Sequence, residues 1–328
     1  MLLYNLQMLV SALCVQMFGH RCGFLIGVHD EFLDALEIIS VESSRLQNTV
    51  SPAVAKRYNL PVWSRLANAN TIALEKARDL VEQELSIAQD RISTGLVEST
   101  AIVDNLIISK DLNHETIVRH IIDLLMAAAD TTAHTLAWCL YLIGQHKDAQ
   151  QKARKELLAA TGNEVANLSA SSLAAVPYIK GMLKEGIRMY PVATFILRAL
   201  SQETVLGRYH TPAGTVVSLS VYSTGRDSRF FSDAENFIPE RWLRHQSSAA
   251  LTCPKQSTGK HHSHAFLPFG IGARSCIGRR LAETQLQVFL AQLLATCQVS
   301  TLQPTHMKMR MVSIPADPIQ IAIQQYND

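Results

Sequence analysis

The stretch that decides the fold is FGIGARSCIG, from Phe269 to Gly278, which surrounds a single cysteine, Cys276. Its glycines lack a Cβ, and such residues let a backbone approach a flat ligand closely. Arg274 lies two residues before the cysteine, and the apolar run that follows predicts a helix. The first N–H groups of that helix would point at the sulfur and favour its anionic form. The stretch therefore predicts a loop that presents a thiolate.

A thiolate in such a loop suits the iron of a heme group. A guanidinium pairs with a carboxylate in bidentate geometry, so Arg274 is placed to bind a heme propionate. A thiolate axial ligand donates electron density to iron and favours cleavage of an O–O bond. The alternative for an isolated cysteine is a small buried apolar residue, because free cysteines are often found inside proteins.

The order FxxGxRxCxG resembles the heme-binding loop of the cytochrome P-450 family at every defining position. The resemblance implies a mainly α fold with small β-sheets and heme b (iron protoporphyrin IX), with Cys276 as the axial iron ligand. It also implies that five residues contact the cofactor: Phe269, Arg274, Cys276, Gly278 and Arg198. Arg198 would bind the second propionate.

Composition fits a globular enzyme, since 48% of the 328 residues are hydrophobic and 18% are charged. The formal net charge of +2 gives no reason to expect a nucleic-acid partner. The six cysteines have no paired spacing, which indicates reduced thiols. The first 18 residues are apolar but interrupted by polar side chains, so they favour a buried helix over a membrane span, and they carry no targeting pattern.

Apolar periodicity predicts the order of the elements. Helices are expected at 1–27, 30–47, 64–90, 113–145 (with Asn113 as N-cap), 147–160, 177–190 and after Cys276. Short strands are expected between Glu203 and Val221, and an exposed loop at 245–264. We expect residues 1–110 to form a helical region on the distal, substrate-access side, and residues 111–328 to form the heme-binding core.

An acid and a hydroxyl, Asp130 and Thr131, lie inside the longest apolar helix. Both compete with backbone hydrogen bonds, so the pair predicts a local opening of the helix for oxygen and protons, or else a satisfied polar pair. The segment resembles the oxygen-activation motif of the P-450 family, which implies catalytic roles for Asp130 and Thr131. It departs from that motif at Ala128, where the family has glycine.

A second motif is Glu185-Gly-Ile-Arg188, which places opposite charges three residues apart on one helix face. An exposed pair of this kind contributes only about 0–1 kcal/mol. Followed by Met-Tyr-Pro191, however, it resembles the ExxR signature of the family. The resemblance adds Arg241 and implies a buried structural network of Glu185, Arg188 and Arg241 behind the cysteine loop. It further implies a substrate pocket lined by residues 192–195 and by residues near Val312, and a folding role for the turn Gly225-Arg-Asp227.

Four basic residues are either a solvated charged face or a docking site for an electron donor. Lys180 and Lys184 share a helix face, and Arg279 and Arg280 follow the cysteine loop. They resemble the mitochondrial branch of the family, which implies docking of an acidic, ferredoxin-type iron–sulfur protein. The chain has no flavin, dinucleotide or P-loop fingerprint, so electrons would come from outside.

The resemblance to the mitochondrial branch implies a monooxygenase that uses O2 on a small hydrophobic, steroid-like substrate, as in invertebrate ecdysteroid hydroxylases. It implies a place on the matrix side of the inner mitochondrial membrane and is compatible with peripheral membrane association; the sequence does not decide the oligomeric state. A zinc site at Cys253, His261, His262 and His264 is disfavoured by its spacing.

Compared with the family, the sequence starts within the fold, so we expect the N-terminal strands and first helices to be lacking. The alternative is therefore a non-catalytic short form with impaired heme binding. A member that needs no external electrons is disfavoured by the retained acid–threonine pair.

Overall fold

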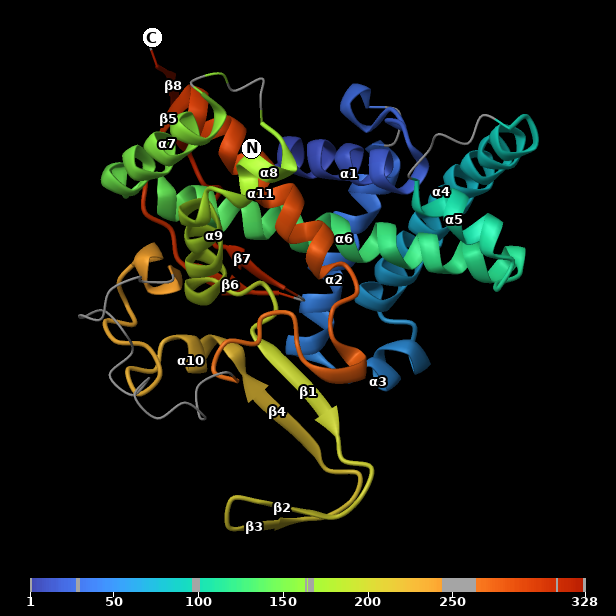
Figure 1. Cartoon of the computed structure of the whole chain (residues 1–328). Coiled ribbons are helices and arrows are strands. Elements are labelled where there is room, and N and C mark those ends of the chain that lie inside the picture. The colour runs from blue at the N-terminus through green and yellow to red at the C-terminus, as the bar shows by residue number, and fades with distance from the viewer. Residues whose placement is uncertain are drawn as a thin grey trace. The chain divides into compact units, whose positions relative to one another are not determined.

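The structure is a computed structural model that describes residues 2–27, 30–95, 101–162, 164, 168–243, 264–310 and 312–326, without the side chains of residues 2–6. It is mainly helical with small antiparallel sheets, as predicted (Figure 1). The chain divides into two compact units, Met1–Ala137 with Thr305–Ile319 (unit 1) and Trp138–Pro304 with Gln320–Asp328 (unit 2). The division expected after residue 110 is a different one, because it separates the chain by function and not by compactness. It stays a prediction.

Unit 1 contains helices and one short hairpin. Its elements are α1 (Leu2–Phe18), the 3-10 turn η1 (Phe24–Ile26), α2 (Asp30–Thr49), α3 (Pro52–Arg57), α4 (Pro61–Ser93), α5 (Ile102–Ser109), most of α6 (His114–Ile143), β6 (Met307–Met309) and β7 (Ser313–Pro315). Proline begins α3 and α4, where its missing N–H has no intrahelical partner to lose.

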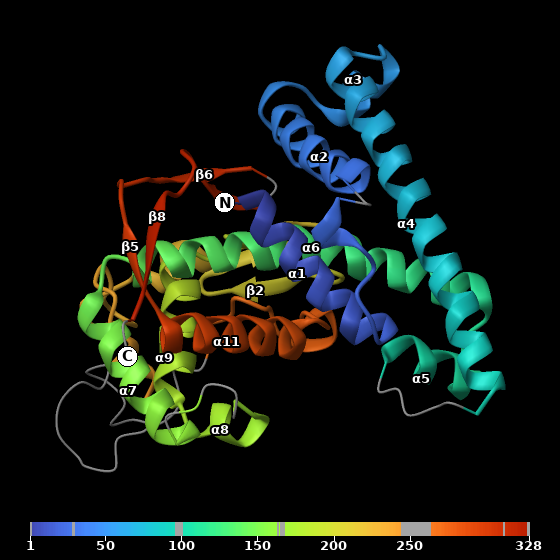
Figure 2. The same cartoon turned by 90° about the horizontal axis from the view of Figure 1, so that it is seen from above.

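The antiparallel pair α2 and α4 forms one side of unit 1 (Figure 2). Ala69, Ala73 and Ala77 recur every four residues on α4 and are buried, so the two helix backbones can approach closely. Arg65 of α4 binds the buried Glu42 of α2 through two hydrogen bonds of 3.1 Å. This bidentate pair fixes the register of the two helices.

The end expected for the first helix is wrong, and the bounds of the other expected helices lie within three residues of those observed. The helix predicted at 1–27 ends at Phe18, because Gly19 adopts φ 87 and its N–H caps the Val15 carbonyl at 2.9 Å. The central helix α6 ends at Ile143, two residues early, with the next residue, Gly144, packed so closely that a Cβ would meet the backbone nitrogen of Thr301 at 2.7 Å. Its start is as predicted, since Asn113 Oδ1 accepts a hydrogen bond from the Thr116 N–H at 2.9 Å.

Unit 2 combines helices with paired short strands. Its elements are the end of α6, α7 (Lys147–Thr161), α8 (Ala170–Ala174), α9 (Pro177–Met189), β1 (Phe195–Ala199), β2 (Thr204–Leu206), β3 (Tyr209–Thr211), β4 (Val216–Ser220), α10 (Val221–Gly225), the 3-10 turns η3 (Pro239–Trp242) and η5 (Gly272–Arg274), α11 (Arg279–Thr296), β5 (Cys297–Thr301) and β8 (Ile321–Gln325).

The strands pair as β1–β4, β2–β3 and β5–β8, all antiparallel, with Phe195 opposite Ser220 and Cys297 opposite Gln325. The predicted strands at 203–221 are present as β2, β3 and β4. The hairpin of β2 and β3 continues the arm formed by β1 and β4 (Figure 1).

The core of unit 2 combines buried leucines of α11 with a buried amide of α7. Leu286, Leu290 and Leu294 on α11 are buried, as the apolar run after Cys276 predicts. The fully buried Gln150 of α7 donates to the carbonyls of Ile143 and Val299, both at 2.8 Å, and accepts from the Val299 N–H at 2.9 Å. Its amide therefore satisfies backbone groups of both α6 and β5.

Candidate functional site

The cysteine loop is a tight turn that leads into α11. The Cys276 N–H donates to the Phe269 carbonyl at 2.8 Å, and the Ser275 N–H donates to the Gly272 carbonyl at 2.9 Å. Gly270 and Gly272 adopt φ values of 70 and 78, in the left-handed region that favours glycine. The two glycines thus let the chain reverse and bring the cysteine back beside the start of the loop.

The thiol of Cys276 is exposed, so the alternative of a small buried residue does not hold for it. Ile277 beside it is 86% exposed and Ile271 is 55% exposed. Among the described residues, no side-chain hydrogen bond or ion pair engages Arg274, which is also exposed. An exposed thiol, apolar neighbours and an uncommitted guanidinium fit an iron porphyrin, whose flat apolar ring carries carboxylates.

Cys139 shows the contrasting environment of a structural thiol. It is fully buried in α6, and burial raises the pKa of its thiol to about 12. It packs so tightly against α9 that a Cβ on Gly186 would meet its sulfur at 2.7 Å. A protonated, enclosed thiol of this kind is unsuited to metal binding.

The remaining predicted heme contacts are dispersed in unit 2. Arg198 is exposed on β1 and donates to the Leu197 carbonyl at 2.8 Å. The Phe269 ring lies under the guanidinium of Arg279, 5.4 Å from the ring centroid. Within the described part of the chain, no hydrogen bond joins Arg198 to the cysteine loop.

The predicted contacts among Glu185, Arg188 and Arg241 are all present. Arg188 binds Glu185 through two hydrogen bonds of 2.7 and 2.9 Å, and neither side chain is exposed to solvent. Arg241 Nε donates to Glu185 Oε1 at 2.9 Å. The sequence did not indicate two further donors, the Trp242 indole N–H at 2.8 Å and the Ile238 backbone N–H at 3.0 Å. The buried carboxylate is therefore fully satisfied.

Arg188 also anchors the segment after α10. Its Nη1 donates to the carbonyls of Gly225 and Ala234, both at 2.6 Å, and its Nη2 donates to the Asn236 carbonyl at 3.1 Å. A Cβ at Gly225 would lie 2.8 Å from the Arg188 carbonyl oxygen, so the close approach requires glycine. Arg188 thereby links α9 to both ends of this segment.

Asp130 and Thr131 lie on an unbroken helix, so the predicted local opening is wrong. Thr131 Oγ1 donates to the Ala127 carbonyl at 2.9 Å and leaves the i−4 ladder in place. The sequence motifs did not indicate His134, whose Nδ1 lies 3.0 Å from Asp130 Oδ1 and 2.8 Å from the Asp130 carbonyl oxygen. A carbonyl only accepts, so Nδ1 carries the proton. The i,i+4 spacing of Asp130 and His134 was a usable signal.

A cavity of about 440 Å³ in unit 1 brings this acid–imidazole pair together with the segment around Val312. Asp130 and His134 line it, as do Arg310 and Ile314 on either side of Val312. Asp130 Oδ2 is buried with no hydrogen-bond partner among the described residues, so it has an uncommitted acceptor. The other predicted pocket segment, residues 192–195, is in unit 2, with Val192 and Thr194 buried and Phe195 exposed.

Three of the four predicted docking residues influence one another in unit 2. Burial lowers the pKa of Lys184, and the positive charges of Lys180 and Arg279 add to this effect. The Lys184 ammonium lies 5.4 Å from the centroid of the Trp242 ring. Arg279 pairs with Glu283 at 3.1 Å, while Arg280 is exposed.

The disfavoured zinc site at Cys253, His261 and His262, together with residues 245–263 of the expected loop, lies outside the described residues. Among the helices that the structure describes, none combines the length and the apolar composition needed to cross a bilayer.

The comparisons with known proteins agree on one family. The chain matches the cytochrome P-450 family over residues 5–323. It is 30% identical to the mitochondrial cholesterol side-chain cleavage enzyme of Hypanus americanus, covering 96% of this chain and 59% of that protein. It is 32% identical to mitochondrial cytochrome P-450 315a1 of Drosophila melanogaster, covering 96% and 56% of the two chains.

Cytochrome P-450 11B2 of Mus musculus, also mitochondrial, is 32% identical and is covered to 57% of its length. The chain thus spans about three fifths of the length of the curated relatives it matches. A crystal structure of a cytochrome P-450 superposes with a TM-score of 0.78 at 20% identity, covering 99% of this chain and 71% of that one. The chain belongs to the cytochrome P-450 family.

Proposed function

We propose that the chain acts as a heme-thiolate monooxygenase, with Cys276 as the iron ligand. The observation that carries the proposal is the exposed thiol at the end of a glycine turn, beside apolar side chains and the uncommitted Arg274. When bound, the heme group supplies the activation of O2 for insertion of one oxygen atom into a C–H bond. Phe269, Gly278 and Arg198 complete the proposed heme contacts.

We further propose that Asp130 carries protons, with His134 as its positioning residue. The protonated Nδ1 of His134 holds Asp130 Oδ1, and the uncommitted Oδ2 is free to accept a proton. Thr131 is the second proposed proton carrier. Its hydroxyl would leave the Ala127 carbonyl, to which it now donates, in order to transfer a proton. Ala128 in place of the family glycine leaves the helix intact at this point.

The substrate proposed is small, hydrophobic and steroid-like, with electrons from a ferredoxin-type protein that docks at Lys180, Lys184, Arg279 and Arg280. Support comes from the names of relatives, which include a cholesterol side-chain cleavage enzyme and several mitochondrial proteins. The matrix side of the inner mitochondrial membrane is the proposed location.

Difference spectroscopy of the reduced protein with carbon monoxide tests the thiolate. The full chain is expected to bind heme and to give the red-shifted Soret band of thiolate ligation, and Cys276→Ser is expected to lose that band. Cys297→Ser is the matched control, because this partly buried cysteine lies outside the loop. No heme uptake, or an unchanged band in Cys276→Ser, would contradict the proposal and favour the non-catalytic short form.

A further inference from the structure

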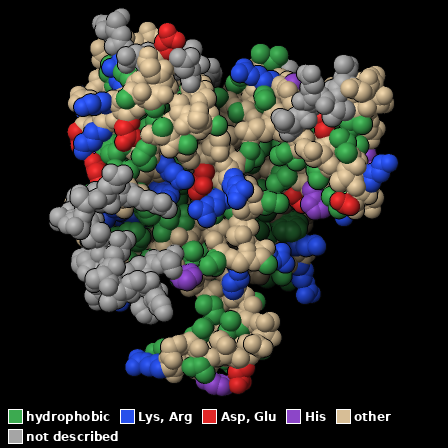
Figure 3. Space-filling view, in the orientation of Figure 1, with side chains coloured by type: hydrophobic (Ala, Val, Ile, Leu, Met, Phe, Trp, Pro, Cys, Tyr) green, Lys and Arg blue, Asp and Glu red, His purple; other side chains and the backbone are tan. Residues whose placement is uncertain are grey.

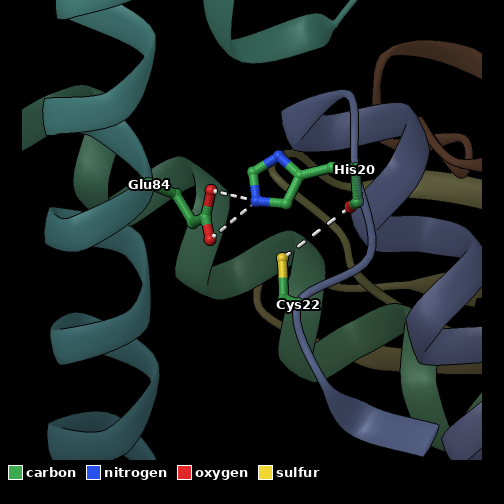
Figure 4. Close-up of side chains that lie close together, drawn as sticks. All are labelled: His20, Cys22 and Glu84. Carbon is green, nitrogen blue, oxygen red and sulfur yellow. Dashed lines mark hydrogen bonds and ion pairs between the residues drawn. The ribbon is translucent and has the colours of Figure 1, made fainter.

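A cluster of metal-binding side chains lies in unit 1, apart from every residue proposed above (Figure 4). His20 and Cys22 are on the loop that follows α1, and Glu84 projects toward them from α4. The imidazole nitrogen, the thiol sulfur and a carboxylate oxygen all lie within 4.8 Å of one another. A single ion could therefore contact all three.

The loop is built to present the two side chains together. Gly19 and Gly23 adopt φ values of 87 and 82, so the chain turns on either side of the segment between them. His20 and Cys22 are two residues apart in irregular backbone, a spacing that in extended chain puts both side chains on one face. The end of α1 at Phe18 adds the negative end of a helix dipole, which favours a cation.

Glu84 is a buried carboxylate that lacks a permanent cation. Its side chain is 5% exposed, and among the described residues its ionic partner is His20, at 3.0 Å from Oε2. One imidazole N–H cannot satisfy both carboxylate oxygens, and the buried Oε2 has no hydrogen bond of its own. Since no lysine or arginine of the described chain pairs with Glu84, the site would gain from a bound positive charge.

A second thiol adjoins the cluster. Side-chain hydrogen bonds join the Cys22 thiol to Cys14 and to Glu84. Cys14 is itself buried on α1. A thiol that coordinates a divalent cation does so without its proton.

We infer that His20, Cys22 and Glu84 bind a zinc ion, with the Cys14 thiol or a water molecule as the fourth ligand. Nitrogen, sulfur and carboxylate donors in one site are the ligand set of zinc, whereas magnesium and calcium prefer oxygen alone. The His20 side chain is 42% exposed, which leaves a path for the ion. The bound ion would join the loop after α1 to the middle of α4.

The chain offers an internal comparison. His114 at the start of α6 and Glu82 on α4 form another histidine–carboxylate pair, at 2.7 Å, but both side chains are exposed and no described thiol adjoins them. If the pair of His20 and Glu84 were only an ion pair, both pairs would treat zinc alike.

The test uses the full, tag-free chain, with or without bound heme, stripped with a chelator and equilibrated with zinc alone. We expect one zinc per chain by elemental mass spectrometry. Absorption fine structure at the zinc edge should show sulfur at about 2.3 Å and nitrogen or oxygen at about 2.0–2.1 Å. This edge is separate from that of heme iron, so failure of the heme proposal would leave the result readable.

Cys22→Ser and Glu84→Gln are each expected to weaken zinc binding at least about tenfold. Glu82→Gln, Cys297→Ser and a variant with both His261→Gln and His262→Gln should retain it. Unaltered binding in Cys22→Ser, a zinc shell without sulfur, or loss only in the His261 and His262 variant would overturn the inference. Should a site variant fail to fold, alkylation of Cys22 in the unmodified chain decides: zinc should slow it, and equal labelling with and without zinc counts against the site.

Discussion

At the scale of single residues, Glu185 is a buried carboxylate that joins α9 to η3 and to the residue before it in unit 2. Its carboxylate has no solvent exposure and accepts hydrogen bonds from Arg188, Arg241, Trp242 and the Ile238 backbone. A buried charge satisfied to this degree contributes little net stability over an apolar core but is very costly to break.

Glu185→Gln should therefore destabilise the chain by about 3–5 kcal/mol, because it leaves the buried guanidinium of Arg188 without a counter-charge. Urea unfolding followed by circular dichroism measures the loss. Glu31→Gln is the matched control, since it breaks an exposed ion pair with Lys76 and should change stability little. Equal losses in the two variants would contradict this account.

Asp130→Asn tests the proposed proton path. Asparagine keeps the shape and a hydrogen bond with His134 but cannot carry a proton, so product formation should fall about 10²-fold or more. The measurement is product formed per O2 consumed, in a complete electron-transfer system. Thermal stability should stay close to that of the unmodified chain, and a variant with full coupling would show that Asp130 is not the proton carrier.

Contacts could be predicted from the sequence where the two partners are close along the chain. Glu185 and Arg188 are three apart on one helix, so their pairing was readable from spacing. The contact of Arg241 was predicted only through family resemblance, and the contact of Trp242 was not predicted. No local sequence pattern indicates a contact between residues 57 positions apart. The zinc cluster divides in the same way: His20 and Cys22 are near neighbours, but Glu84 is brought in by the packing of α4.

At the scale of secondary-structure elements, contacts at glycine determine how closely α9 packs. Gly186 leaves room for the sulfur of Cys139 on α6, and Gly181 leaves room for the Pro239 carbonyl on η3. Alanine would favour the helix by up to about 1 kcal/mol at either position, but overpacking costs about 1–3 kcal/mol.

Gly186→Ala should destabilise the chain by about 1–2 kcal/mol, and the second change Cys139→Ala should reverse most of the loss. Removing the sulfur leaves the nearest remaining atom, Cys139 Cα, at an ordinary 3.6 Å from the new Cβ. Chemical denaturation of the two single variants and the double variant gives the coupling energy. Gly181→Ala is the control. Its new Cβ would lie 2.8 Å from the backbone oxygen of Pro239, so no side-chain substitution can restore the lost stability. Additive losses at 186 and 139 would refute the contact.

Glu240 on η3 links two helices through Lys152 of α7 at 2.6 Å and Tyr178 of α9 at 3.0 Å. Burial alone would raise the pKa of Glu240, but the hydrogen bonds from Lys152, its own backbone and Tyr178 hold it below its ordinary value of 4.5. The same pair raises the pKa of Lys152 above its ordinary 10.5.

Glu240→Gln should therefore cost about 1 kcal/mol at neutral pH, given the exposure of Lys152. The carboxylate's contribution is present above its unfolded pKa and is lost as pH falls through the lower folded value. The contribution of the Lys152 ammonium is present below its unfolded pKa and is lost as pH rises through the higher folded one. Thermal unfolding across pH should show the difference between the chains shrinking at both ends, and a difference independent of pH would contradict the linkage.

The short strands show what local patterns miss. β4 was predicted from its β-branched residues, but β1 was not, because Phe195, Leu197 and Ala199 are all exposed and give no apolar–polar alternation. β5 and β8 pair residues that are 20 to 28 positions apart, from Thr301 with Ile321 to Cys297 with Gln325, and the sequence does not show which backbone groups pair.

At the scale of the whole molecule, the net charge of +2 is too small to attract a partner over long distances. Basic and acidic side chains both occur across the face drawn in Figure 3. Under the proposed function, attraction of an acidic ferredoxin would therefore come from the local grouping of Lys180, Lys184 and Arg279, with Arg280 next to Arg279 in the chain.

Reduction by an acidic ferredoxin should accordingly slow at least about tenfold between about 0.1 M and about 1 M ionic strength. A variant with Lys180→Gln and Arg280→Gln should be slower at low salt and less sensitive to salt, as stopped-flow measurements would record. Lys308→Gln, an exposed lysine of unit 1, is the control and should change neither. A salt response unaltered in the double variant would place docking elsewhere.

The openness of the cysteine loop also makes it chemically vulnerable. Peroxide attacks accessible thiols first and converts them to sulfenic and then, irreversibly, to sulfinic acid. Burial protects Cys139 from this reaction, whereas Cys276 is exposed. A chain whose Cys276 is oxidised by peroxide to the sulfinic acid before it binds heme would lose its iron ligand irreversibly, so reductant during isolation should govern how much of a preparation can take up heme.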